Sequence, residues 1–164
     1  FGARRAALAA TCALVFSAVP GSAGAADSAC WNYSKAERKF ARLTNEARSA
    51  AGLRKLSLDP ELSRVARKHT SEMIADGALT HTSGITLGKR VTRWRKLGEN
   101  VGRGDGVAII QATFMNSAIH KSNIMKPGFR HVGIGAKRAD GYLWVTVVFE
   151  SRRDPGTTLS MPKC

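Results

Sequence analysis

One carboxylate and two histidines are the residues of this sequence best suited to build a site. Glu99 lies between Gly98 and Gly102 in a stretch that reads as a short strand. Glycine at such positions lets other parts of the chain approach closely or lets the strand bend. His81 follows the end of one amphipathic pattern, and His120 lies late in another. We predict that Glu99 and the two histidines meet in one cleft.

Two imidazoles and one carboxylate could hold a divalent metal such as zinc, with one position left open for water. His81, Glu99 and His120 are therefore the candidate metal ligands. Binding would require neutral imidazoles and an ionised carboxylate, so metal affinity would fall on acidification. The alternative is a metal-free cluster in which the three side chains hydrogen-bond to one another. The sequence leaves both possibilities open.

Catalysis would need more than these three side chains. A metal-bound water could hydrolyse an ester or amide, but Glu99 would then have to be both a ligand and the general base. The sequence contains no H-E-x-x-H pattern. Ser117 lies three residues before His120 and so on a neighbouring helix face, yet a helix interior offers a serine no sharp turn and no oxyanion donors. We assign no catalytic residue.

Hydrophobic spacing predicts the helices that must position these residues. Helices are predicted at 35–51, 60–76, 86–96 and 107–125. Asp59 and Pro60 are typical of a helix start, and Asp105 is placed as the cap of the last helix. His69 falls on the apolar face of the second helix, where a core histidine is expected. The third predicted helix carries basic residues around Trp94, which we expect to be buried, and His81 lies in a loop at 79–84.

Two strands complete the predicted fold. Residues 132–137 and 142–150 flank Asp140-Gly141, which is a strong hairpin signal. The second strand is apolar on both faces, which requires cover on both faces. We therefore predict an α+β fold: a three-layer α/β/α sandwich with a small antiparallel sheet.

The ends of the chain indicate export. Residues 1–25 combine Arg4 and Arg5, an apolar run and small residues near Ala25, which is the pattern of a secretory signal peptide. We divide the rest into an N-terminal segment (26–39), one domain (40–150) and a C-terminal tail (151–164). Cys30 and Cys164 remain after cleavage, and two cysteines in an oxidising compartment predict one disulfide, with free thiols as the alternative.

The charge of the chain bears on its partners. Lys and Arg number 26 against 12 Asp and Glu, a formal net charge of +14. A basic exported protein is expected to meet an anionic cell-wall polymer, lipid or glycan. We expect a monomer without sequence-specific nucleic acid binding and without a transmembrane segment once the signal peptide is removed. The alternative is that the charge serves solubility alone.

An ordered set of short motifs resembles a known family. The motifs are Leu43-Thr44-Asn45-Glu46-Ala47-Arg48, Leu79-Thr80-His81, Gly98-Glu99-Asn100-Val101, Asn116-Ser117-Ala118-Ile119-His120, Ser122-Asn123-Ile124-Met125 and Val132-Gly133-Ile134-Gly135. Together they resemble the bacterial branch of the CAP superfamily, whose SCP domains are related to cysteine-rich secretory proteins, antigen 5 and plant pathogenesis-related proteins.

The resemblance implies an α/β/α sandwich and a central cleft. Eukaryotic members line this cleft with two histidines and two glutamates, and several bind a divalent metal there. His81, Glu99 and His120 match three of these positions, and Ser117 stands where the second glutamate would be. The resemblance therefore implies a ligand-binding cleft of His81, Glu99, Ser117 and His120 in a secreted binding module. The alternative is a metal-dependent hydrolase that uses the same cleft.

Overall fold

The computed structural model describes residue 2 and residues 31–151. The predicted signal peptide, the predicted Cys30–Cys164 disulfide and nearly all of the tail lie outside the described residues.

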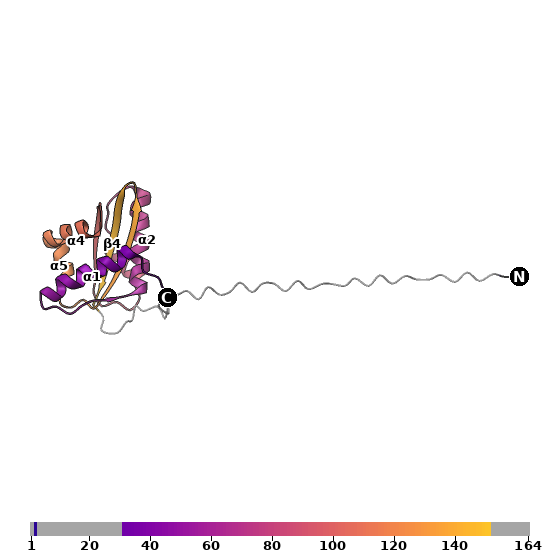
Figure 1. The fold of residues 1–164 in the computed structure, drawn as a ribbon. Coiled ribbons are helices and arrows are strands. Elements are labelled where there is room, and N and C mark those ends of the chain that lie inside the picture. The colour runs from indigo at the N-terminus through magenta and orange to yellow at the C-terminus, as the bar shows by residue number, and fades with distance from the viewer. Residues whose placement is uncertain (1, 3–30, 152–164) are drawn as a thin grey trace.

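A four-stranded sheet forms the middle of the domain (Figure 1). Its strands are β1 (Ser57–Leu58), β2 (Leu97–Gly104), β3 (His131–Ala139) and β4 (Tyr142–Glu150). Their order is β1-β3-β4-β2, so β2 lies at one edge. The predicted hairpin of β3 and β4 is antiparallel, and β2 pairs with β4 in the same sense, while the two-residue strand β1 pairs with β3 in parallel. The sheet is therefore antiparallel except for one short edge strand that sequence patterning missed.

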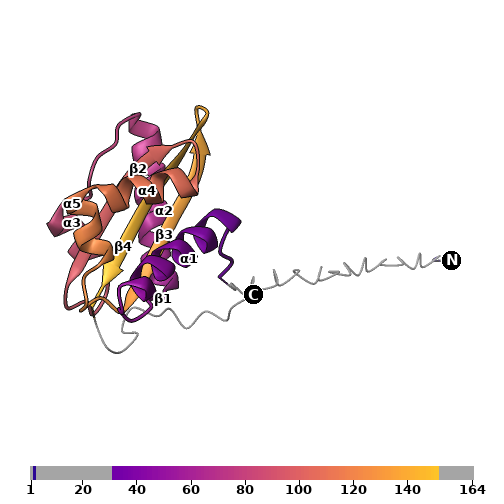
Figure 2. The same ribbon diagram turned by 60° about the vertical axis from the view of Figure 1, so that its left-hand side comes forward.

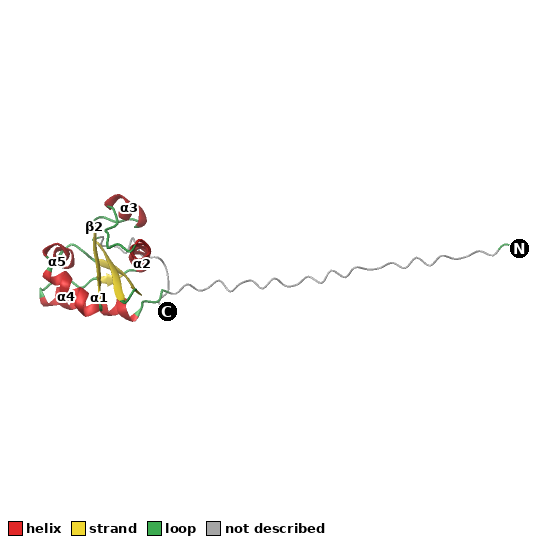
Figure 3. Cartoon of the chain, turned by 90° about the horizontal axis from the view of Figure 1, so that it is seen from above, coloured by secondary structure: helices red, strands yellow, loops and turns green. Residues whose placement is uncertain are grey.

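Helices cover both faces of the sheet. They are α1 (Lys35–Ala50), α2 (Pro60–Asp76), α3 (Gly84–Arg90), α4 (Val107–Asn116) and α5 (Ala118–Ile124). Viewed from above, α2 lies on one side of the sheet, and α1, α4 and α5 lie on the other (Figure 3). The second view shows the same layers from another side (Figure 2). This confirms the predicted three-layer sandwich.

The two faces of β4 belong to two separate cores, as its sequence predicts. Leu143, Val145, Val147 and Phe149 pack with residues of α1 and α4. On the opposite face, Val148 packs with α2 and α3, and Trp144 packs with Met73 of α2 and Val101 of β2. Successive side chains of a strand point to opposite faces. Because Val101 of β2 packs with Trp144, the faces taken by the other residues of β2 follow from their distance to Val101.

Helix α2 lies unusually close to the sheet because β3 contains glycines. A Cβ atom on Gly133 would lie 2.1 Å from the carbonyl carbon of Leu62, and one on Gly135 would lie 2.4 Å from that of Ala66. The backbones of α2 and β3 are thus in direct contact. The limits of α2 are those predicted: the Asp59 side chain accepts the Leu62 N–H at 2.9 Å, and Gly77 ends the helix in the left-handed conformation.

Two predicted helices differ from those observed. The third begins at Gly84 and ends at Arg90, so Trp94 lies beyond it and is 45% exposed, with its indole N–H donating to the Gly88 carbonyl at 2.9 Å. The prediction of a buried Trp94 was wrong because it assumed a continuous helix face. The predicted helix at 107–125 is broken at Ser117, whose backbone is extended. Gly106, not Asp105, is its N-terminal cap.

The break at Ser117 was not visible in the hydrophobic spacing, because the apolar stripe continues across it. Serine favours helix ends over helix interiors, since its side chain competes with the backbone for hydrogen bonds. Ser117 both ends α4 and precedes α5. Ser117 and His120 therefore do not sit on one continuous helix, and the face-sharing argument for this pair was wrong.

Candidate functional site

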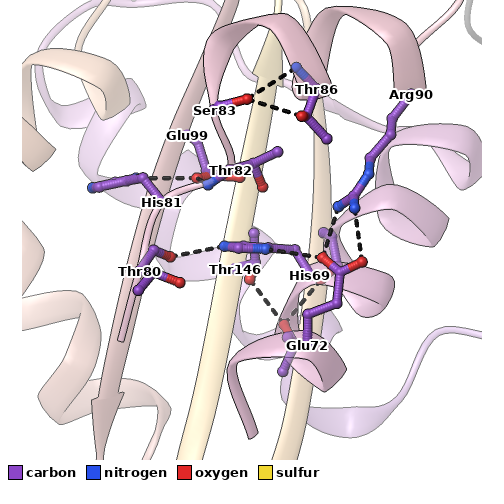
Figure 4. A network of polar contacts seen from close by, with 12 residues as sticks. His69, Glu72, Thr80, His81, Thr82, Ser83, Thr86, Arg90, Glu99 and Thr146 are labelled. Carbon is purple, nitrogen blue, oxygen red and sulfur yellow. Dashed lines mark hydrogen bonds and ion pairs between the residues drawn. The ribbon is translucent and has the colours of Figure 1, made fainter. Parts of the chain in front are cut away.

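Glu99 anchors the loop that carries His81. The Glu99 Oε1 atom accepts the Thr82 backbone N–H at 2.8 Å and lies 3.0 Å from His81 Nδ1. The Glu99 side chain is 5% exposed, whereas that of His81 is 56% exposed. The carboxylate is thus held at the base of the loop while the imidazole reaches outward (Figure 4).

A second histidine fixes the same loop from below. His69 Nε2 lies 2.8 Å from the Thr80 carbonyl oxygen, and its Nδ1 lies 3.3 Å from Glu72. Glu72 in turn accepts two hydrogen bonds from Arg90 of α3 (Figure 4). Arg90 lowers the pKa of Glu72 through these bonds, and the neighbouring His69 lowers it further. His69 is therefore a buried structural histidine, as expected, and it positions the loop of the candidate site.

His120 is held on α5 by a pair of asparagines that sequence reasoning did not single out. Asn100 of β2 donates to the His120 carbonyl at 3.0 Å. Asn123 donates to the Asn100 side chain at 2.9 Å and to the Glu99 carbonyl at 3.1 Å. The His120 ring packs against Phe114, with ring centroids 4.8 Å apart. The two asparagines fasten α5 to the edge strand, and both lie in motifs that carried the family resemblance.

The alternation of β2 separates the site into two halves. Val101 packs toward α2, so Glu99, two residues earlier, takes the same face. Asn100 takes the opposite face, where it meets α5 and the carbonyl of His120. The two halves therefore lie on opposite faces of β2, which is an edge strand of the sheet. They remain within electrostatic reach, because the charge of His81 acts on His120.

This arrangement does not fit the predicted three-ligand metal site. Within residues 31–151, no three His, Cys, Asp or Glu side chains are grouped so that they could hold a metal ion. The Nδ1 atom of His81 is also turned to Glu99, the residue predicted to be its fellow ligand. Metal ligation by His81, Glu99 and His120 stays a prediction. Ser117 lies between α4 and α5, and within residues 31–151 its side chain forms no hydrogen bond with the other three residues.

Three residues of the two halves carry buried polar atoms without a hydrogen-bond partner. Glu99 Oε2, His120 Nδ1 and Thr82 Oγ1 are all buried, and none has a hydrogen-bond partner among the described residues. A buried polar atom without a partner costs about 1–3 kcal/mol. These atoms belong to a loop, a strand and a helix, and each could form a hydrogen bond with a ligand that reaches it.

Burial also sets the protonation of His120. Loss of hydration lowers the pKa of His120 below its ordinary value of 6.5, and the nearby His81 lowers it further. The neutral imidazole is therefore favoured at neutral pH. Neutral imidazole has one nitrogen that donates and one that accepts, which suits a ligand rich in hydroxyl groups.

Comparison with known proteins places this fold and site in a family. The model of the cysteine-rich secretory protein family, CAP, matches residues 41–149. The chain belongs to this family, and the resemblance seen in the sequence is confirmed. Among curated proteins, it is similar to the uncharacterized protein YkwD of Bacillus subtilis (strain 168), with 32% identity over 117 residues that cover 66% of this chain and 44% of YkwD.

Solved structures share the fold. An extracellular protein containing a SCP domain from Bacillus anthracis str. Ames is 30% identical with a TM-score of 0.61, and the match covers 71% of this chain and 40% of that protein. A structure of NaASP2 with Zn²⁺ is 11% identical with a TM-score of 0.59, covering 73% and 83% of the two chains, and shows a common fold alone. The chain thus spans less than half the length of these two Bacillus relatives. No helix in the described part of the chain is long and apolar enough to cross a membrane.

Proposed function

We propose that this protein is a secreted CAP-domain binding module that holds a hydroxyl-rich ligand, such as a glycan of the cell envelope, at the edge of β2. The observation that carries the proposal is the group of three buried, unpartnered atoms: Glu99 Oε2, His120 Nδ1 and Thr82 Oγ1. An ionised carboxylate only accepts hydrogen bonds, while imidazole and hydroxyl can also donate. A sugar ring supplies neighbouring hydroxyls that do both.

The surroundings support binding rather than catalysis. Glu99 Oε1 is already committed to Thr82 and His81, so this carboxylate positions a loop and is poorly placed to move a proton. Ser117 contributes no hydroxyl at a sharp strand-to-helix turn of the kind that a nucleophilic serine needs. Secretion is supported by the signal-peptide pattern and by the extracellular Bacillus relative.

Titration with soluble N-acetylglucosamine oligomers, followed by amide NMR, tests the proposal. We expect shifts at Thr82, Glu99 and His120, and at least a tenfold loss of affinity in Glu99→Gln, which keeps the side-chain shape but removes the charge. Glu46→Gln is the matched control, because Glu46 is an exposed carboxylate of α1 that pairs with Arg42 of the same helix. Equal affinity in Glu99→Gln and Glu46→Gln, or no binding to the parent, would contradict the proposal.

The metal-dependent hydrolase remains the alternative, and zinc binding is its first requirement. If His81, Glu99 and His120 converge on one ion, His120→Ala should weaken zinc binding by orders of magnitude, and Ser117→Glu, which restores the family's second carboxylate, should strengthen it. From the two-sided arrangement around β2 we expect no such difference. Calorimetric titration of zinc into the parent and both variants distinguishes the two results.

A further inference from the structure

A cavity lies where β2 and β3 begin and β4 ends. Its volume is about 620 Å³, and its lining residues are Arg95, Lys96, Lys126, Gly128, Arg130 and Ser151. Backbone hydrogen bonds hold its walls together: the Ser151 N–H donates to the Lys96 carbonyl at 3.1 Å, and the Arg130 N–H donates to the Glu150 carbonyl at 2.8 Å. Segments that are far apart in the sequence are thus fixed around one opening.

Four of the six lining residues are cations, and none of these four forms an ion pair within residues 31–151. The carboxylate of Glu150 is fully buried and accepts the backbone N–H of Arg95 at 3.2 Å. By contrast, Arg67 and Arg90 elsewhere in the fold each pair with a glutamate. The four cations of this cavity are thus not neutralised by an ion pair within residues 31–151.

A buried guanidinium adds to the positive field. Arg48 is 0% exposed and donates only to backbone carbonyls, those of Arg54, Ile124 and Lys126, at 2.7–3.0 Å. Its Nη2 atom has no partner among the described residues. Burial lowers the pKa of Arg48, and the charge of Arg130 lowers it further. The charges of Arg48 and Arg130 thus act on one another, and Arg48 adds to the positive charge at this end of the sheet.

We propose that the basic cavity lined by Arg95, Lys96, Lys126 and Arg130 binds the phosphate group of an anionic ligand. Two guanidinium groups can each present paired N–H donors to a phosphate, and two ammonium groups add charge without requiring one geometry. A phosphate group offers more acceptor oxygens than a single carboxylate, which suits a cavity lined by four cations. This inference does not depend on the ligand proposed for the edge of β2.

Inorganic phosphate titrated into the full chain at constant ionic strength is the first test. We expect amide shifts at Lys96, Gly128 and Ser151 that saturate, and at least a tenfold weaker affinity in Lys126→Gln/Arg130→Gln. The control is Lys39→Gln/Lys68→Gln, which removes the same charge from exposed positions on α1 and α2. The control should bind within twofold of the parent.

Further variants and probes complete the test. Arg95→Gln alters an exposed side chain and should weaken phosphate binding severalfold even if the double variant fails to fold. A glycerol-phosphate polymer and vesicles containing phosphatidylglycerol then represent the two natural sources of phosphate. The natural ligand is the probe whose binding is weakened more by the cavity variants than by the control variant. No saturable binding of phosphate, or an equal loss in cavity and control variants, would overturn the proposal. Glu99→Gln should leave phosphate binding unchanged. A failure of the phosphate proposal can therefore be distinguished from a failure of the glycan proposal.

Discussion

At the scale of single residues, His120 makes stability depend on pH. Burial and the nearby His81 lower its folded-state pKa below 6.5. As the pH falls below 6.5, the unfolded chain takes up the proton first, so the free energy of unfolding decreases until the pH passes the folded-state pKa. We expect urea unfolding between pH 7.5 and 5 to show this loss, and NMR to show His120 titrating below 6.5.

Two variants isolate this effect. His120→Gln should flatten the decrease in stability, because glutamine does not titrate. His81→Gln should raise the pKa of His120, since it removes the repulsion that His81 contributes. A His120 resonance that titrates at 6.5 or above in the parent would contradict the burial seen here.

The residues of the candidate site show what a sequence can and cannot reveal. The contact between His81 and Glu99 was predictable, because a loop histidine and a glycine-flanked carboxylate are separated by only 18 positions and one short helix. The placement of His120 on the other face of β2 could not be predicted. It depends on which face of the strand each helix packs against, and the sequence pattern does not show this. Asn100 and Asn123 drew no prediction for a related reason: amides carry no charge or metal preference that marks them in a sequence.

At the scale of elements, the contact between α2 and β3 depends on glycine. Gly133→Ala would place a methyl group 2.1 Å from the backbone of Leu62, and a helix backbone cannot move locally as a flexible side chain can. Overpacking of a core typically costs about 1–3 kcal/mol, and sometimes more. We expect Gly133→Ala to lose at least about 3 kcal/mol of unfolding free energy, measured in urea.

Gly84→Ala is the matched control for this substitution. Gly84 is the first residue of α3, and a Cβ there would meet nothing within 4 Å. Alanine also favours helix over glycine. This variant should be as stable as the parent or slightly more so, and a comparable loss in both variants would show that the close packing of α2 is not the cause.

The elements themselves divide clearly into those that sequence patterning finds and those it does not. Helices α1 and α2 and strand β4 are found within one residue of their limits, because each has strong periodicity and a clear cap. The two-residue strand β1 has too few residues to show a period. The end of α3 was missed because basic residues continue at helical spacing beyond Arg90. The break at Ser117 was missed because the apolar stripe continues beyond the end of α4.

At the scale of the whole molecule, the net charge of +14 predicts salt-sensitive adsorption to anionic surfaces. Exposed charges interact over about one Debye length, ~8 Å at physiological ionic strength. We expect binding to vesicles rich in anionic lipid to collapse as salt rises from low to near-molar concentration in a sedimentation assay. Binding that persists at high salt would instead point to a specific contact, and neutral vesicles serve as the control surface.

The extended backbone at Ser117 has a consequence for how the domain opens. Helix α5 has seven residues and one fully buried side chain, Ile124, and it is separated from α4 by the extended backbone of Ser117. Short units with few buried contacts open locally at a lower free energy than the core. Amide hydrogen exchange should therefore be faster in α5 than in α2. It should become faster still in Asn123→Ala, which removes the hydrogen bonds from Asn123 to Glu99 and Asn100 of β2. Such opening would move His120 away from Glu99 while the sheet stays folded. The rate at which α5 opens would then set the rate at which a ligand reaches the site.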